Sequence, residues 1–296
     1  MTIQPDFHEY GQKDAAAPYY RSYDLDGGIK LELGARTLIM GILNATPDSF
    51  SDGGRFNDTE AAVAHARAMV AEGADMIDIG GESTRPGFDP VPLEEELRRV
   101  LPVIRAVRET LPGVPLSVDT YKAETARQAL EAGAHIINDI WGLKADPKMA
   151  QVAAEYGCPV IVSHNRHARD YADLVPDVAA DLRASVAIAR AAGVADNAIW
   201  LDPGIGFAKT YGDNMRLMGS LRYITSLGYP VLLGTSRKKF IRDTLRLADA
   251  GETAFGTAAT VTLGIAQGCQ IVRVHDVRDM KRNALMADAI IYADSR

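Results

Sequence analysis

Short apolar runs along this chain of 296 residues repeatedly end in side chains that could do chemistry. The clearest case is Gly41–Ser51, where an apolar run stops at Asn44 and is followed by hydroxyls, a proline and a carboxylate. Asp52–Gly54 comes next, so the chain is expected to leave regular structure there. We interpret the segment as a strand that delivers polar groups to a loop at its carboxyl end.

Seven further apolar runs end in the same way. The polar segments that follow them are, in order, Asp78 with Gly80–Gly87, Asp119–Thr120, Asn138–Asp139, Ser163–Arg166, Asp202–Phe207, Ser236–Lys239 and Arg273–Asp276. Any one strand-end Asp or Asn could simply cap the helix that follows it. Polar residues at the ends of all eight runs favour one shared site.

The polar strand ends fall into two groups by charge. The first group consists of acceptors and amides, namely Asp78, Asp119, Asn138 and Asp202. It suits a flat, nitrogen-rich heterocycle with several N–H donors. The second group is cationic and consists of Lys238, Arg273 and His275, with Arg85 from the second loop. It suits a diphosphate, to which Asn44 could add an oxygen ligand for Mg²⁺.

Other patterns carry less chemistry. Gly204–Gly206 is too short for a dinucleotide fingerprint, and Ser236–Lys238 lacks the upstream glycines of a P-loop. His164 and His167 have no third zinc ligand at a convincing spacing. We therefore interpret His164 as a hydrogen-bonded histidine at a strand end.

The elements that must position these residues alternate between strand and helix. The expected strands are Ile39–Leu43, Met76–Ile79, Leu116–Val118, Ile136–Ile137, Val160–Val162, Ile199–Leu201, Val231–Leu233 and Ile271–Val274. Helical periodicity lies between them, for example over Thr59–Glu72, Leu93–Glu109, Ala123–Ala132, Asp177–Ala192 and Gly256–Gln267. Eight strand–helix units predict an α/β fold with a closed (β/α)8 TIM barrel, rather than an open doubly wound sheet.

The N-terminal segment is expected to stand apart from the barrel. Residues 1–28 are polar and irregular, so we predict a peripheral arm, followed by one barrel domain over residues 29–296. Ile29–Leu33 alternates, and Gly34–Arg36 has the composition of a turn before Thr37–Ile39. This pattern predicts a hairpin between the two flanking segments.

Composition narrows the possible partners and the compartment. The formal net charge is −7, which disfavours a broad surface for nucleic acid or for an anionic membrane. No apolar run approaches the roughly 20 residues that a membrane helix needs. The N-terminus does not look like a secretory signal. The two cysteines are far apart and have no metal-ligand spacing, so we expect a reduced, cytoplasmic protein.

Taken together, these motifs closely resemble those of the dihydropteroate synthases of bacterial folate biosynthesis. The resemblance runs from about residue 38 to the C-terminus. It is densest over Gly41–Gly54, Asp78–Gly87, Ser117–Thr120, Ile136–Ile140, Leu201–Lys209, Leu233–Lys238 and Arg273–Val277. The chain departs from the family at Ser163, where many members have Met, and at Lys239, where Ser is usual.

The resemblance implies a reaction and its partners. Members of this family use Mg²⁺ to join 6-hydroxymethyl-7,8-dihydropterin diphosphate to p-aminobenzoate, and the products are 7,8-dihydropteroate and diphosphate. Most are homodimeric (β/α)8 barrels, and sulfonamides compete with p-aminobenzoate. Departure of diphosphate is the difficult step, so we favour a dissociative path. The rival interpretations are a pterin-binding methyltetrahydrofolate methyltransferase and a non-catalytic pterin-binding homologue.

The resemblance also implies roles for individual residues. The pterin would be held by Asp119, Asn138, Asp202 and Lys238, with Asp78 beneath them. The diphosphate would meet Asn44 with Mg²⁺, Arg85, Arg273 and His275. The p-aminobenzoate pocket would be shaped by Thr84, Pro86, Phe207 and Ser236. The first two loops would form a lid through Asp52, Thr84 and Arg85, and catalysis would depend on Asp119, Lys238, Arg273 and His275.

Overall fold

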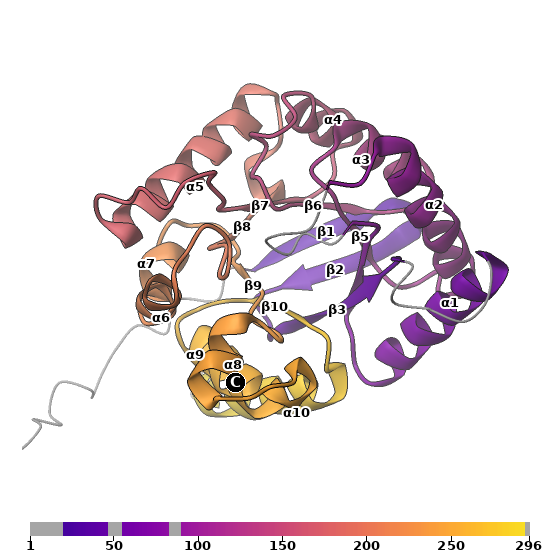
Figure 1. Ribbon diagram of the computed structural model, residues 1–296. Helices are drawn as coiled ribbons and strands as arrows, with labels where there is room; N and C mark the ends of the chain where they lie inside the picture. The colour runs from indigo at the N-terminus through magenta and orange to yellow at the C-terminus, as the bar shows by residue number, and fades with distance from the viewer. Residues whose placement is uncertain (1–19, 47–54, 83–89, 294–296) are drawn as a thin grey trace, which may run out of the picture.

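Eight parallel strands form the centre of the molecule, and the helices surround them (Figure 1). The computed structural model describes residues 20–46, 55–82 and 90–293. The strands are β3 (Leu38–Asn44), β4 (Met76–Gly80), β5 (Leu116–Asp119), β6 (Ile136–Asp139), β7 (Val160–Ser163), β8 (Ile199–Asp202), β9 (Leu232–Leu233) and β10 (Ile271–Val274). They run in the order β8-β7-β6-β5-β4-β3-β10-β9, and a parallel bridge from Leu201 to Val231 joins the two edges. The predicted barrel and its eight expected strands are confirmed.

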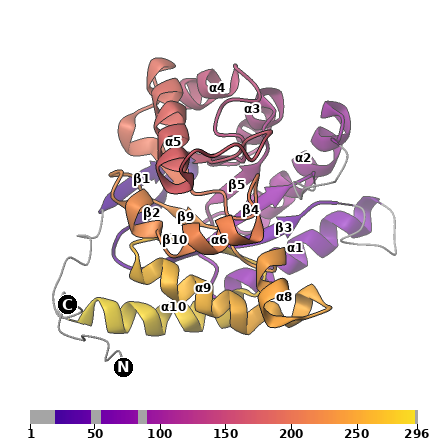
Figure 2. The ribbon, with the colours of Figure 1, turned by 60° about the vertical axis from the view of Figure 1, so that its left-hand side comes forward.

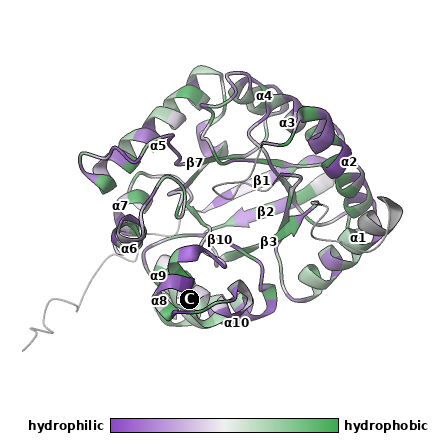
Figure 3. Cartoon of the chain, in the orientation of Figure 1, coloured by the Kyte–Doolittle hydropathy of each residue, from purple (hydrophilic) through white to green (hydrophobic). Residues whose placement is uncertain are grey.

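The helices follow the strands around the ring. They are α1 (Arg55–Ala71), α2 (Leu93–Thr110), α3 (Ala123–Glu131), α4 (Met149–Tyr156), α5 (Leu174–Ala191), α6 (Tyr211–Met218), α7 (Leu221–Thr225), α8 (Lys239–Leu245), α9 (Ala254–Ala266) and α10 (Val277–Ile291). Hydrophilic and hydrophobic residues alternate along them in Figure 3, as expected of helices with one face on a sheet. None of the helices in the described ranges has the length and hydrophobicity that a bilayer-spanning segment requires.

The strand side chains alternate between the helix ring and the barrel interior. In β4, Ile77 and Ile79 belong to the apolar layer between sheet and helices, whereas Met76 belongs to a separate interior cluster. Because both faces of the sheet are covered, the strands are hydrophobic on both sides, which is why they appear as continuous apolar runs in the sequence.

The N-terminal hairpin differs from the predicted one. β1 (Arg21–Leu25) pairs antiparallel with β2 (Ile29–Leu33), and Asp26–Gly28 forms the turn between them, with both glycines at positive φ. The predicted partner was wrong, because the chain after Thr37 enters the barrel as β3, where it pairs with β4 and β10. Residues 21–25, which were expected to be irregular, form the first strand of this hairpin.

The hairpin closes one end of the barrel. Tyr23, Leu25, Ile29, Leu31 and Leu33 are buried, and they cluster with eight inward-facing strand residues: Leu38, Met40, Met76, Ile136, Ile161, Trp200, Leu232 and Ile271. Tyr23 Oη accepts a 2.8 Å hydrogen bond from Trp200 Nε1 and donates a 2.7 Å bond to the carbonyl of Asn197. We call this apolar plug the barrel floor; the open side lies at the opposite, carboxyl ends of the strands.

Candidate active site at the barrel mouth

Two residues beyond the floor, the inward-facing positions become polar. The pairs along each strand are Met76 and Asp78, Ile136 and Asn138, Ile161 and Ser163, Trp200 and Asp202, and Ile271 and Arg273. Strand register places Asp78 opposite Ser117, Asp119 opposite Asn138, and Ser163 opposite Asp202. We call this layer the barrel mouth. It contains the four predicted acceptors and amides, Asp78, Asp119, Asn138 and Asp202.

Arg273 links the acceptors of neighbouring strands. Its Nε donates to Asp78 Oδ2 at 2.5 Å, and its Nη2 donates to Asp119 Oδ2 at 2.7 Å. Asn138 Nδ2 donates to the same Asp78 oxygen at 3.1 Å. Burial alone would lower the pKa of Arg273, but the two carboxylates raise it, so the guanidinium remains charged. One cation is thus shared between two buried carboxyl groups.

Because Arg273 is shared with Asp78, it compensates the negative charge of Asp119 only in part. Burial raises the pKa of Asp119 to about 7; Asp78 adds to this rise, and Arg273 opposes it. Asp119 can therefore accept or donate a hydrogen bond near neutral pH. Four buried oxygens of this layer have no hydrogen-bond partner within the described part of the chain: Asp78 Oδ1, Ser117 Oγ, Asp119 Oδ1 and Ser163 Oγ. A ligand with several donors and acceptors would satisfy them.

Asp202 and Lys238 form the next sector of the mouth. Asp202 Oδ1 accepts a 2.7 Å hydrogen bond from the backbone N–H of Gly204, and burial raises its pKa against the pull of Lys238. Burial lowers the pKa of Lys238 to about 8, opposed by Asp202. Lys238 Nζ donates to the carbonyl of Ile205 and lies 4.7 Å from the centre of the Phe207 ring.

Ser236 and His275 are neighbours at the cationic side. The Ser236 hydroxyl accepts a 3.2 Å hydrogen bond from the backbone N–H of His275 and lies 3.0 Å from its Nδ1. Arg237, between Ser236 and Lys238, instead pairs with Asp276 at 2.6 Å. Asn44 ends β3 and is half-buried. The predicted cations Lys238, Arg273 and His275 therefore come from neighbouring strand ends, β9 and β10.

Several predicted residues lie outside the described part of the chain. They are Asp52 of the first loop and Thr84, Arg85 and Pro86 of the second. Their predicted roles in the lid, at the diphosphate and around p-aminobenzoate stay predictions.

His164 and Lys209 form a polar cluster behind the mouth. His164 is fully buried between Asp181 and Lys209, which confirms the expected hydrogen-bonded histidine. The described residues hold no group of three or more His, Cys, Asp or Glu side chains arranged to bind a metal. No role was predicted for Lys209 or Ser117. A lysine in a loop and a serine in a strand carry no pattern, and their only signal was their place in the matched segments.

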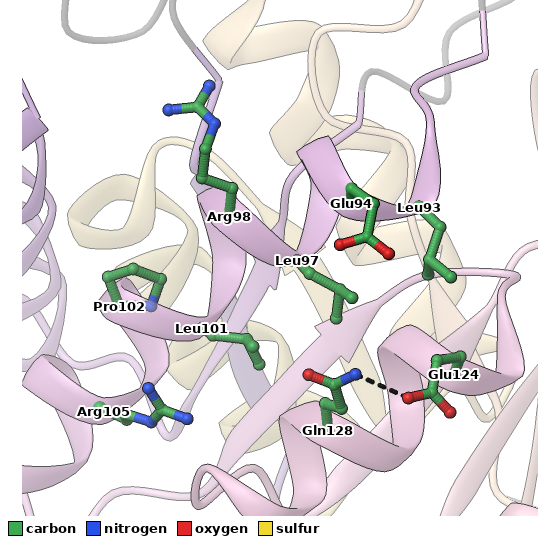
Figure 4. Close-up of a pocket in the computed structure, with 9 residues that line it drawn as sticks. All are labelled: Leu93, Glu94, Leu97, Arg98, Leu101, Pro102, Arg105, Glu124 and Gln128. Atoms are coloured by element: carbon green, nitrogen blue, oxygen red, sulfur yellow. Dashed lines mark hydrogen bonds between the residues drawn. The ribbon is translucent and has the colours of Figure 1, made fainter.

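A groove on the outside of the barrel is a poor alternative site. It has a volume of about 590 Å³ and lies between α2 and α3, where Leu93, Leu97 and Leu101 form its wall (Figure 4). Three of its polar groups have partners, since Gln128 donates to Glu124 at 2.6 Å and Arg98 pairs with Glu95. It holds no buried, unpartnered polar atom of the kind found at the mouth.

Comparison with known proteins gives one consistent result. Residues 40–275 match the family model described as pterin binding enzyme. The chain is 58% identical over 256 residues to the dihydropteroate synthase of Bacillus subtilis (strain 168), a match that covers 86% of this chain and 89% of that protein.

Two solved structures share the fold. The Clostridium difficile dihydropteroate synthase, crystallised in the presence of pteroic acid, is 47% identical with a TM-score of 0.86, over 88% of this chain and 98% of that one. The Xanthomonas albilineans enzyme with 4-aminobenzoic acid is 42% identical with a TM-score of 0.86, over 91% and 98% of the two chains.

Proposed function

The chain belongs to the dihydropteroate synthases of the pterin-binding enzyme family, and on that premise we propose how its residues divide the reaction. The enzyme is a transferase that condenses 6-hydroxymethyl-7,8-dihydropterin diphosphate with p-aminobenzoate. The products are 7,8-dihydropteroate and diphosphate. We propose that sulfonamides, which mimic p-aminobenzoate, bind the same pocket, since the Yersinia pestis enzyme forms a complex with a sulfonamide drug.

The polar layer of the mouth carries this proposal. A pterin presents N–H donors and ring acceptors along its edge, and the mouth offers carboxyl, amide and hydroxyl groups on adjacent strands. We assign the pterin edge to Asp119, Asn138 and Asp202, with Lys238 at its rim. Asp78 holds Asn138 and Arg273 in place from beneath, through the 3.1 Å and 2.5 Å contacts described above. The four unpartnered oxygens are the observation that favours a ligand over a closed core.

The diphosphate lies, in our proposal, at the cationic side. Arg273 and His275 would stabilise the charge that grows on the departing oxygen. Arg85 of the second loop is proposed to do the same, although it is not among the described residues. Cations after the last two strands fit the usual phosphate position in barrels of this class.

Mg²⁺ fits this end of the site as a companion of the diphosphate. Asn44 supplies one hard oxygen ligand, and the described residues form no cluster that could hold the ion alone. The ion would neutralise charge on the diphosphate oxygens when it binds there. Asn44 would orient the phosphate end relative to the pterin.

The p-aminobenzoate ring packs, in our proposal, against Phe207, close to Ser236. An aryl amine is already neutral at pH 7, so the site needs no strong base for it. The barrier is the loss of diphosphate from the methylene carbon, and we infer a dissociative path. The electron-rich pterin ring and the carboxyl groups of the mouth would stabilise the pterin methylene cation, and burial would keep water from it.

One assay separates the candidate functions. A dihydropteroate synthase releases diphosphate from the pterin substrate at a rate that depends on p-aminobenzoate. A methyltetrahydrofolate methyltransferase or a non-catalytic homologue would bind pterins and release none. Positional isotope exchange within the diphosphate tests the dissociative path; silence under conditions where the reaction is demonstrably reversible would contradict it.

We also propose that two copies of the chain associate through α9 and α10, which pack side by side along one side of the barrel (Figure 2). Large apolar side chains are exposed there: Phe255 (91% exposed), Leu263, Leu285, Met286 and Ile290. Exposed apolar patches of this kind mark interaction surfaces. Light scattering should show a dimer that Phe255→Glu weakens; a monomer at micromolar concentration would refute the proposal.

The compartment is a separate inference. We propose that the enzyme works in the cytoplasm, since Cys158 and Cys269 are buried free thiols rather than a disulfide. Fractionation of cells that express the chain tests this, and recovery from the extracellular medium would contradict it.

A further inference from the structure

Lys209 is a second buried lysine behind the mouth, and the reaction as described does not use it. Its side chain is almost fully buried, with 4% of the residue exposed. Its Nζ donates three hydrogen bonds, to His164 Nδ1 at 2.8 Å, to the carbonyl of Gly204 at 2.9 Å and to the carbonyl of Phe207 at 3.1 Å. All three donor positions of an ammonium are thus occupied by uncharged acceptors.

The two carbonyls are the ends of one tight turn. Gly204 to Phe207 closes with a 3.1 Å backbone hydrogen bond from the Phe207 N–H to the Gly204 carbonyl. Gly204 has φ 67°, and a Cβ there would lie 1.9 Å from the carbonyl oxygen of His164, so the turn is pressed against the neighbouring loop. Lys209 therefore binds both ends of the turn that presents Phe207.

His164 anchors the ammonium from the adjacent loop. Burial and the nearby Lys209 lower the pKa of His164, so the imidazole is neutral. Because Nδ1 accepts from Lys209, Nε2 carries the proton and donates to Asp181 Oδ2 at 3.0 Å. Arg166 Nε donates to the same Asp181 oxygen at 2.6 Å. The chain of contacts runs from α5 through His164 to the turn.

The opposite side of the turn is held by Lys238. Its Nζ donates to the carbonyl of Ile205, inside the turn, and lies over the Phe207 ring.

Burial lowers the pKa of Lys209 to about 7, opposed by Asp202, while Lys238, Arg166 and Asp213 are the other charged groups that act on it. A neutral residue would avoid the cost of burying this ammonium, so its presence here points to a role beyond packing.

We propose that Lys209 is a positioning residue for the p-aminobenzoate subsite, acting through His164 and the Gly204–Phe207 turn to fix the Phe207 ring. It touches no substrate itself. The inference rests on the proposed role of Phe207 in that subsite. A Phe207 ring that is already held at one angle can contact the flat substrate without the entropy cost of ordering the ring when the substrate binds.

The test uses the whole chain of 296 residues and a double-mutant cycle. Lys209→Met removes the ammonium and keeps an unbranched apolar side chain, and Phe207→Leu removes the ring. Asp288→Asn is the matched control, because Asp288 is equally buried and binds Thr37 on another part of the chain. Lys209→Gln, which can still donate to a carbonyl, replaces Lys209→Met if the latter does not fold.

Steady-state kinetics should separate positioning from general damage. Lys209→Met should raise the KM for p-aminobenzoate about tenfold and change the KM for the pterin diphosphate by less than about twofold, the size expected from one lost hydrogen-bonded group. In the Phe207→Leu background the same substitution should add less than about twofold, since coupled residues are not additive. Full additivity of the two substitutions in the KM for p-aminobenzoate would overturn the proposal. Equal increases in both KM values, like those of an Asp288→Asn variant that loses as much thermal stability, would also overturn it.

Hydrogen exchange provides a readout that does not depend on activity. Exchange of the amides in residues 203–210 should accelerate at least about tenfold in Lys209→Met and not in Asp288→Asn. Unchanged exchange would overturn the inference even in an active enzyme. If wild type fails the diphosphate-release assay while exchange responds as expected, the proposed function fails and the structural part of this inference stands.

Discussion

The floor and the mouth of the barrel are built on the same strands, only two residues apart, and they differ in whether their polar atoms are satisfied. At the floor, the Tyr23 hydroxyl and the Trp200 N–H bind each other, and Asn197 completes the set. At the mouth, four buried oxygens lack a partner within the described residues. A buried polar atom without a partner costs folding free energy. The floor is therefore built for stability, whereas the mouth keeps its polar atoms for a ligand.

The largest expected effect tests the mouth. Lys238→Ala should lower kcat/KM by about 10²- to 10³-fold, the usual cost of removing a charged donor from a reacting site. The free energy of unfolding should not fall with it, because the buried ammonium already costs stability, as its lowered pKa shows. Steady-state kinetics and urea unfolding measure the two quantities.

The next residue is the control for this change. Lys239 is also a lysine, but its side chain is 77% exposed and pairs with Asp243 in the same helix. Lys239→Ala should leave kcat/KM within about twofold of wild type and change stability by about 0.5 kcal/mol or less. A similar loss of activity in both variants would mean that general charge, rather than the mouth, matters.

The fold was more predictable from the sequence than the contacts of the site. Strand ends such as Asn44 and Asp202 were recognisable, because an apolar run must stop where the barrel opens to ligand. The partner of Ile29–Leu33 was missed because Arg21–Leu25 has only two apolar residues, Tyr23 and Leu25, and because its Asp26–Gly28 turn was interpreted as a domain boundary.

The contacts of the site depend on side-chain direction, which spacing does not reveal. Arg273 was expected at the diphosphate, and its guanidinium lies on Asp78 and Asp119. Lys209 was passed over because a single lysine in a loop has no periodic signature. The contacts of Arg273 with Asp78 and of Lys209 with His164 join residues that are 195 and 45 positions apart in the sequence. They follow from the closure of the barrel rather than from any local pattern.

The second prediction uses pH to expose the unsatisfied charge of the mouth. Because the pKa of Asp119 is raised to about 7, the folded state holds its proton between about pH 4 and 7 while the unfolded chain has lost it. This group's contribution to stability therefore falls as pH rises through that window. Asp119→Asn cannot titrate, so between pH 5 and 8 its unfolding free energy should rise relative to wild type by about 2 to 3 kcal/mol.

Urea unfolding of the two proteins at matched pH values measures this difference. Other titrating groups, including Asp139 with its pKa raised by burial to about 6, are present in both proteins and largely cancel. A difference that is the same at pH 5 and pH 8 would mean that Arg273 compensates Asp119 fully, and the mouth would then be as satisfied as the floor.

The smallest and most direct comparison removes one hydroxyl from each region. Tyr23→Phe leaves the Trp200 N–H and the Asn197 carbonyl without their partner, so the unfolding free energy should fall by about 1 to 2 kcal/mol. Ser163→Ala removes a hydroxyl that has no partner in the described chain, so stability should stay the same or rise by up to about 1 kcal/mol.

The effects of the two substitutions on substrate binding should be the reverse of their effects on stability. Tyr23→Phe should leave both KM values unchanged, because the floor touches no substrate. Ser163→Ala should raise the KM for the pterin diphosphate about three- to tenfold if the hydroxyl binds the pterin, the value of one neutral hydrogen bond. If Ser163→Ala instead destabilises the free protein as much as Tyr23→Phe does, the Ser163 hydroxyl is satisfied without ligand. The proposed difference between a floor with satisfied polar atoms and a mouth with unsatisfied ones would then be contradicted where the two layers are nearest, since Ser163 lies only two residues beyond Ile161 of the floor.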